Sequence, residues 1–85
     1  MRTVNLYEVP WHLDNPKAER TLGKLHEEGK IELTITVCPS YVAELYRMPF
    51  ASTDGWGRYF GLQGIETLLQ KLAAEEGDNN DVDER

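Results

Sequence analysis

Cysteine is almost absent from this chain, because Cys38 is the only one among its 85 residues. A single cysteine cannot form an intrachain disulfide, so the sequence excludes a disulfide-stapled secreted scaffold. It also excludes every zinc site that is built from several cysteines. We therefore expect a protein of a reducing compartment, and the predicted location is the cytoplasm.

Long apolar runs and basic clusters are missing as well. No apolar stretch approaches the ~20 residues that a transmembrane helix needs, and no basic-plus-apolar run predicts a signal peptide. The chain holds 15 acidic and 9 basic residues, which gives a net charge of −6. Because nucleic-acid binding needs a basic stripe against the phosphates, we expect neither a nucleic-acid partner nor a membrane partner.

The negative charge is concentrated at the end of the sequence. Residues 75–85 hold six acids and one base, whereas residues 1–74 are nearly neutral at −1. A segment with this charge and only Val82 as an apolar residue buries too little surface to fold. The predicted organisation is one small domain over residues 1–74, followed by a disordered acidic tail at residues 75–85.

Hydropathy patterns in the first half predict a strand, a helix and a strand. Apolar and polar residues alternate over residues 2–9 and, most clearly, over residues 30–37. Residues 16–28 carry apolar side chains at helical spacing, and Asn15-Pro16 is typical of a helix start, with Asn15 expected to cap the helix through its side-chain oxygen. This order predicts a parallel βαβ unit with a right-handed crossover. The clean alternation at 30–37 indicates a lightly covered sheet face, which a homodimer would cover.

The second half predicts a hairpin and a last helix. Residues 39–46 suit a short helix or a strand, and their apolar spacing favours a short helix. An Asp-Gly pair in the middle of residues 50–62 is a hairpin-turn signal. An apolar stripe over residues 64–73 then predicts a helix that docks on the sheet.

This order of elements resembles the thioredoxin-like fold in its glutaredoxin form, over most of residues 3–73. Three stretches carry the resemblance: Leu6-Tyr7 with Pro10, Ala18 and Leu22; Met48-Pro49-Phe50; and Gly61 to Ile65 with Leu68 and Leu69. They look like the family's first strand, active-site loop and first helix, its cis-proline segment, and its glycine-containing turn into the last helix. The resemblance implies an α/β fold with the order βαβ-(α)-ββα, a mixed sheet of about four strands and two main helices.

The resemblance breaks at the family's redox motif. His12-Leu13-Asp14-Asn15 stands where Cys-x-x-Cys would lie, and thiol–disulfide exchange needs a thiolate. We therefore expect a redox-inactive protein. The surface equivalent to the family's peptide groove would include Trp11, His12, Asp14, Pro49 and Phe50. The predicted function is that of a protein-binding or assembly module, whose partner is another protein or a second copy.

An alternative function is a single-thiol redox or transfer enzyme that uses Cys38. A cysteine before Pro39 at a predicted helix start can be activated as a nucleophile. A cysteine at a strand end is more often a small, half-buried side chain, and that interpretation is favoured because no partner cysteine or neighbouring histidine is apparent. His12 and Asp14 are a candidate acid–base pair or simply loop and capping residues. We expect no cofactor and no metal, since the two histidines lack ligand spacing.

Overall fold

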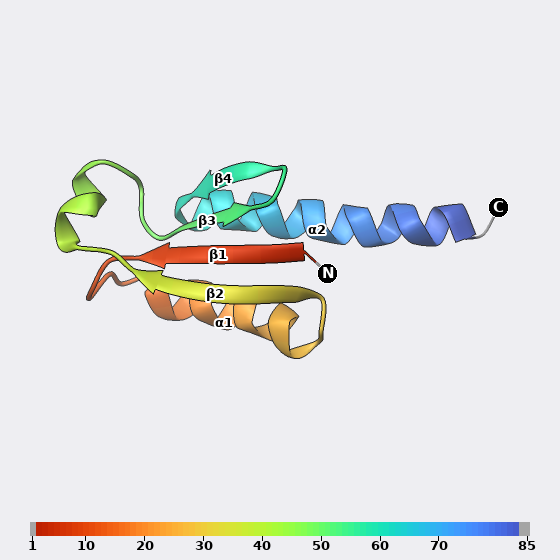
Figure 1. The fold of residues 1–85 in the computed structure, drawn as a ribbon, viewed down its shortest axis with the longest axis horizontal. Helices are drawn as coiled ribbons and strands as arrows, with labels where there is room; N and C mark the ends of the chain where they lie inside the picture. Colours follow the sequence, from red (N-terminus) through yellow and green to blue (C-terminus); the bar gives the residue numbers. More distant parts are fainter. Residues whose placement is uncertain (1, 84–85) are drawn as a thin grey trace.

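The computed structural model describes residues 2–83, with side chains described for residues 2–75. The elements follow one another in the order seen in Figure 1. They are β1 (Arg2–Glu8), α1 (Asn15–Glu27), β2 (Ile31–Val37), the 3₁₀ turn η1 (Ser40–Glu44), β3 (Phe50–Thr53), β4 (Gly57–Phe60) and α2 (Gly61–Asp83). The 3₁₀ helix η1 lies within residues 39–46, where the sequence favours a short helix over a strand.

The four strands form one mixed sheet in the order β2-β1-β3-β4. Strand β1 runs parallel to β2, while β3 runs antiparallel to both β1 and β4. The predicted α/β architecture is confirmed at this level, with a parallel βαβ unit, a hairpin, a four-stranded mixed sheet and two helices. The chain places β1 in the interior of the sheet, so its side chains meet neighbours on both sides.

The main core lies between one face of the sheet and both helices, which Figure 1 shows behind the strands. Alternate residues of β1, Val4 and Leu6, are fully buried there. The other buried members come from α1, β2, β3 and α2: Ala18, Leu22, Ile31, Ala51, Ile65 and Leu68. Since both helices share this face, no α-helix of residues 2–83 lies over the opposite face, here called the open face.

The open face is covered at one end only. There the segment that contains η1 folds over a second, smaller core of Val9, Met48 and Phe50. The Phe50 ring stacks on Tyr7 at a centroid distance of 4.8 Å and lies 5.1 Å from Phe60. Further along β2, the open face presents exposed polar side chains, among them Thr34. The uneven covering explains the clean alternation of the β2 sequence.

The start of α1 differs from the prediction, in which Asn15 caps the helix. The N-cap is Asp14, and its side chain makes no capping hydrogen bond. Asn15 Nδ2 instead donates to the backbone carbonyl oxygen of Val9, 2.8 Å away. The Asn15 cap was therefore the wrong interpretation, because its amide ties the end of β1 to the start of α1.

Helix α2 is longer than the sequence predicts at both ends. It begins at Gly61, directly after β4, and runs to Asp83, within the segment predicted as a disordered tail. The strong helix formers of residues 73–76 favour this continuation. Arg2 anchors the helix, because its guanidinium lies 3.7 Å from the Trp56 ring centroid and pairs with Glu75. Residues 84 and 85 lie outside the described residues. Over residues 2–83, no helix is long and apolar enough to cross a membrane.

Two helical glycines provide a matched test of the packing between β4 and α2. A Cβ atom at Gly64 would lie 2.7 Å from the Tyr59 carbonyl carbon, whereas one at Gly23 would meet nothing within 4 Å. We expect Gly64→Ala to lower the free energy of unfolding by about 2 kcal/mol through this backbone clash. Gly23→Ala should raise it by up to about 1 kcal/mol through helix propensity. Urea unfolding measures both, and equal effects would contradict the close approach.

Candidate functional site

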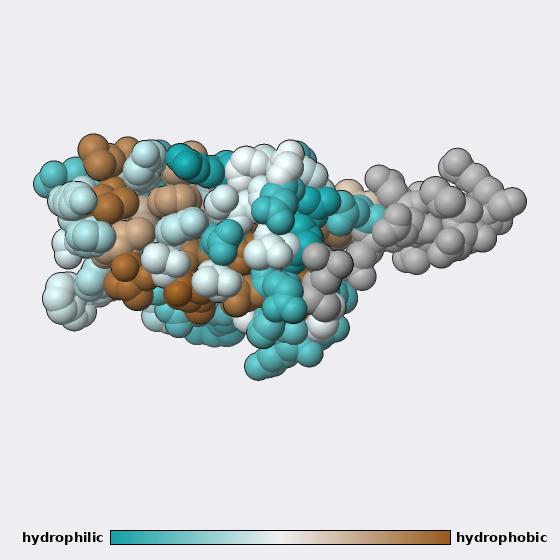
Figure 2. Space-filling model, viewed as in Figure 1, coloured by the Kyte–Doolittle hydropathy of each residue, from teal (hydrophilic) through white to brown (hydrophobic). Residues whose placement is uncertain are grey.

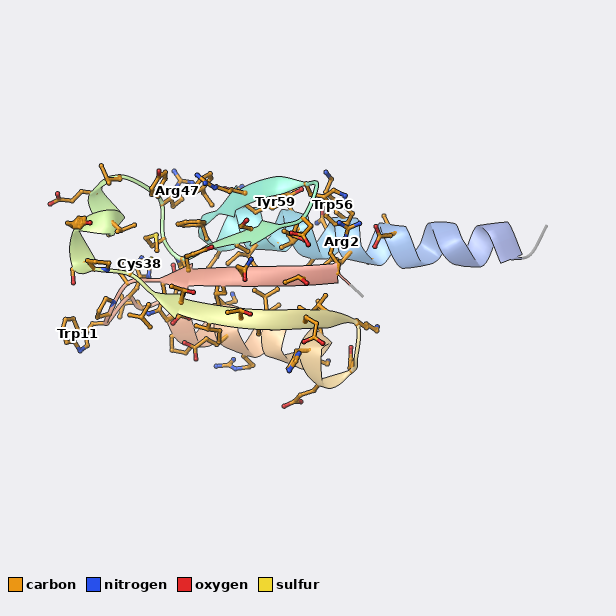
Figure 3. The ribbon with its side chains drawn as sticks, in the orientation of Figure 1. Arg2, Trp11, Cys38, Arg47, Trp56 and Tyr59 are labelled. Carbon is orange, nitrogen blue, oxygen red and sulfur yellow. The ribbon has the colours of Figure 1, made fainter. Side chains whose placement is uncertain are left out.

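The loop between β1 and α1 presents the most exposed large apolar side chains of the described chain. Trp11 is 90% exposed and Leu13 is 93% exposed. Figure 3 shows Trp11 pointing away from the body of the molecule. Its backbone has a φ of 62°, the left-handed region that a bulky residue rarely adopts. Such a conformation costs on the order of 1–3 kcal/mol, so the fold holds Trp11 outward at a cost.

The other two predicted site residues of this loop form a backbone turn. His12 Nδ1 accepts a hydrogen bond from the backbone N–H of Asp14, 3.1 Å away. The backbone N–H of Asn15 donates in turn to the carbonyl oxygen of His12 at 3.2 Å. The imidazole of His12 is therefore hydrogen-bonded to the backbone amide of Asp14 and not to its carboxylate. This arrangement fixes the loop and does not make His12 a base oriented by Asp14.

Pro49 and Phe50, the remaining predicted binding residues, are buried at the start of β3. The Met48–Pro49 peptide bond is cis. Phe50 is opposite Tyr7 in the sheet register and belongs to the aromatic cluster of the smaller core. The structure thus brings Trp11, His12 and Asp14 together in one loop, while Pro49 and Phe50 support the sheet beneath the surface.

Exposed apolar side chains gather where β1 and β2 end. Within residues 2–75, every exposed large apolar side chain falls between residues 11 and 46. These residues are Trp11, Leu13, Ile35, Val37, Tyr41, Leu45 and Tyr46, and we call this surface the apolar end. Figure 2 shows brown surface on this left side of the molecule and more teal toward α2. The carboxyl ends of parallel strands are a common place for binding sites in α/β layers.

Several members of the apolar end were missed by the sequence analysis. Val37 continues the alternation of β2, and Leu45 fits a helical apolar stripe, so both patterns assign them to a core. In the structure the burial of β2 falls off after Leu33, and the short 3₁₀ helix η1 has no buried residue. No local sequence signal distinguishes these residues from buried ones.

A cavity of about 280 Å³ lies on the open face beside η1. Its lining consists of Tyr7, Cys38, Val42, Tyr46, Phe50, Ser52 and Arg58. The Cys38 thiol is half-buried and unpaired, and its backbone N–H donates to the Glu8 carbonyl oxygen. Arg58 is the only charged residue in this lining, which otherwise is mainly aromatic and contains no histidine. The cavity therefore offers a thiol and a cation, with no imidazole to serve as a base.

A buried carboxyl group, Glu8, is the one strongly perturbed titratable group of the described chain. Glu8 is only 4% exposed, on the helix side of β1. Burial, a hydrogen bond with the Glu19 carboxyl group and the negative charge of Glu19 raise the pKa of Glu8 from 4.5 to about 7. The sequence contains a signal for this burial, because Glu8 continues the inward positions Val4 and Leu6.

Comparison with known proteins identifies no family for this chain, and the described residues form no metal-binding cluster. Neither a protein-family model nor a curated protein nor a solved structure matches this chain. Within the described residues, no group of three or more His, Cys, Asp or Glu side chains is arranged to hold a metal ion. The features that bear on function are therefore the apolar end, the cavity and the charges described above.

The pKa of Glu8 predicts how stability depends on pH. Because this pKa is raised on folding, the folded state binds more protons than the unfolded state between pH 4.5 and about 7. The contribution of Glu8 to stability is therefore complete below pH 4.5 and is lost as pH rises through 7. We expect Glu8→Gln to raise the free energy of unfolding at pH 8 by about 2 kcal/mol. This value is smaller than the full pKa shift of Glu8 would give, because water screens the charge of the exposed Glu19.

Urea unfolding from pH 5 to pH 8 measures this effect. Wild type should lose stability across the range, and Glu8→Gln should show a flatter profile. Glu27→Gln, an exposed carboxylate on α1, is the control and should follow wild type. A Glu8→Gln profile as steep as that of wild type would contradict the assignment.

Proposed function

We propose that this protein is a small protein-binding module that contacts its partner through the apolar end. The observation that carries the proposal is Trp11, a large apolar side chain held 90% exposed in an unfavourable backbone conformation. Unfavourable conformations persist mainly where they serve a function. Tryptophan is also the residue type most enriched among energetically dominant contacts of protein interfaces.

We also propose that the fold is thioredoxin-like. The support is the strand order β2-β1-β3-β4 with β3 antiparallel, the α1 crossover between β1 and β2, and Pro49 directly before β3. In this interpretation the β1–α1 loop keeps its place at the end of the sheet but carries no thiol. The loop then acts through apolar contact, and the protein is a redox-inactive binding module of the cytoplasm.

The partner that fits this surface is a protein segment with apolar side chains. Trp11 and Leu13 carry no charge, and the turn of His12 and Asp14 fixes the loop that presents them. A preformed loop loses little conformational freedom on binding, which favours affinity. Polar loop groups around the two side chains would form the rim of the interface.

The test compares variants of this loop in peptide binding. Peptides selected from a displayed random library on the full chain are measured by fluorescence anisotropy against wild type, Trp11→Gly and Leu13→Ser. We expect each variant to bind at least 10-fold more weakly. Trp11→Gly should nevertheless unfold at higher urea, with a gain of about 1 kcal/mol, because glycine adopts a positive φ without cost.

Gln70→Ala, on the exposed surface of α2, is the control and should bind like wild type. A structural role for Trp11 would instead make Trp11→Gly less stable than wild type. Selected peptides that bind all variants equally would show that the apolar end is not the binding surface.

A single-thiol enzyme that uses Cys38 is the second candidate. The observation in its favour is that Cys38 and Arg58 line the same cavity. It ranks second because the cavity lining supplies no base for the thiol. If the site recognises anions, iodoacetate should alkylate Cys38 at least 3-fold faster relative to iodoacetamide than it alkylates free cysteine.

Mass spectrometry follows both alkylation rates. Arg58→Gln should return the ratio to that of free cysteine, because it removes the positive charge from the cavity. Lys71→Gln changes a charge outside this lining and is the control. The same ratio in wild type and Arg58→Gln would remove the enzyme candidate.

A further inference from the structure

Strand β2 forms an outer edge of the sheet that lacks the usual protections against pairing. Ile31–Val37 contains no proline, no lysine and no interruption in its register with β1. Its only charged residue is Glu32. Natural sheets commonly protect a free edge with charges, prolines or bulges, since an unprotected edge is a template for another strand. An edge of seven residues without them is therefore suited to pairing.

The hydrogen bonds of the sheet show which backbone groups of β2 point outward. The Cys38 N–H donates to the Glu8 carbonyl oxygen of β1 and so points inward. Because successive residues of a strand direct their backbone groups to opposite sides, Ile31, Leu33, Ile35 and Val37 point theirs toward the free edge. His26 Nδ1 lies 3.1 Å from the Ile31 carbonyl oxygen, which agrees with this direction. The Ile31 N–H and the groups of Leu33, Ile35 and Val37 remain for a partner.

We propose that a second copy of this chain pairs with this edge, β2 against β2 in antiparallel orientation around a two-fold axis at Thr34. Thr34 is the central residue of the strand, so this register uses all seven residues. Leu33 is then opposite Ile35 of the other copy, and Ile31 is opposite Val37. These are residues with outward backbone groups, as hydrogen-bonded antiparallel pairs require. The two sheets become one sheet of eight strands.

The side chains fit the same register. Ile35 is 43% exposed and Val37 is 63% exposed, both on the helix side of the sheet. In the dimer each lies beside an apolar residue of the other copy, because residues opposite one another share a face. On the open face Glu32 is opposite Thr36, so no two like charges meet. This self-complementarity favours a second copy over an unrelated strand.

The dimer would cover Ile35 and Val37 of the apolar end, whereas the proposed function depends on Trp11 and Leu13, which take no part in the β2 pairing. Substitution of Trp11 should leave the dimer intact, and substitution of Thr34 should leave the Trp11 loop intact. Failure of one proposal is therefore distinguishable from failure of the other.

Cysteine cross-linking tests both the dimer and its register. Thr34→Cys and Thr36→Cys are each made with Cys38→Ser, and the folded full chains are oxidised mildly. At the axis the two Thr34→Cys residues form a directly opposed pair without backbone hydrogen bonds, whose Cα atoms lie ~4.5 Å apart and suit a disulfide. Thr36→Cys is opposite Glu32 and is the control. We expect cross-linking at least 10-fold faster for Thr34→Cys.

Charge substitution at the axis provides a second measurement. Thr34 is exposed, so Thr34→Lys and Thr34→Glu should unfold like wild type at low protein concentrations, where wild type is also monomeric. Each should sediment as a monomer where wild type is a dimer, and an equimolar mixture should restore the dimer through opposite charges at the axis. A wild type that is monomeric at several hundred micromolar, or equal cross-linking of the two cysteine variants, would overturn the proposal.

Discussion

The fold depends on the burial of one face of β1 beneath the two helices, which pack on the same side of the sheet. Val4 and Leu6 are fully buried there, and elements far apart in sequence meet on them. Burying two aliphatic side chains of this kind contributes several kcal/mol, a large share of what stabilises a small domain. Since both helices occupy one face, the segment that contains η1 is the only part of the described chain that covers the other face, and it covers one end. The cavity beside Cys38 and the exposed polar face near Thr34 result from this partial covering of the open face.

Much of this architecture was predictable from the sequence, because it is determined by periodicity. The alternation of β2 and the spacing in α1 correctly predict a parallel βαβ unit, and the Asp-Gly pair predicts the hairpin. Element boundaries were less predictable. Asn15 resembles a cap by residue type, but tertiary contact with the end of β1 determines what its amide does. Gly61, with a φ of 72°, allows α2 to begin directly after β4.

The candidate site was predictable only in part. Composition and loop position pointed to Trp11, but the positive φ that makes it unusual is a property of the folded loop. Phe50 has the residue type of a binding residue and is buried, because its ring completes the aromatic cluster with Tyr7. Val37 continues the apolar alternation of β2 and is nevertheless exposed, which the local pattern does not encode. Surface exposure depends on which other elements pack on a strand, and the sequence of that strand alone does not determine this.

The buried position of Glu8 also links folding to the proton concentration of the medium. At pH 6 an unfolded chain holds this carboxyl group ionised, whereas the folded chain holds it mainly protonated beside Glu19. Each molecule that folds therefore takes up most of one proton from its buffer. The heat of folding then includes the ionisation heat of the buffer, so it differs between phosphate and imidazole solutions. Folding of this chain near pH 6 therefore consumes protons that the buffer supplies.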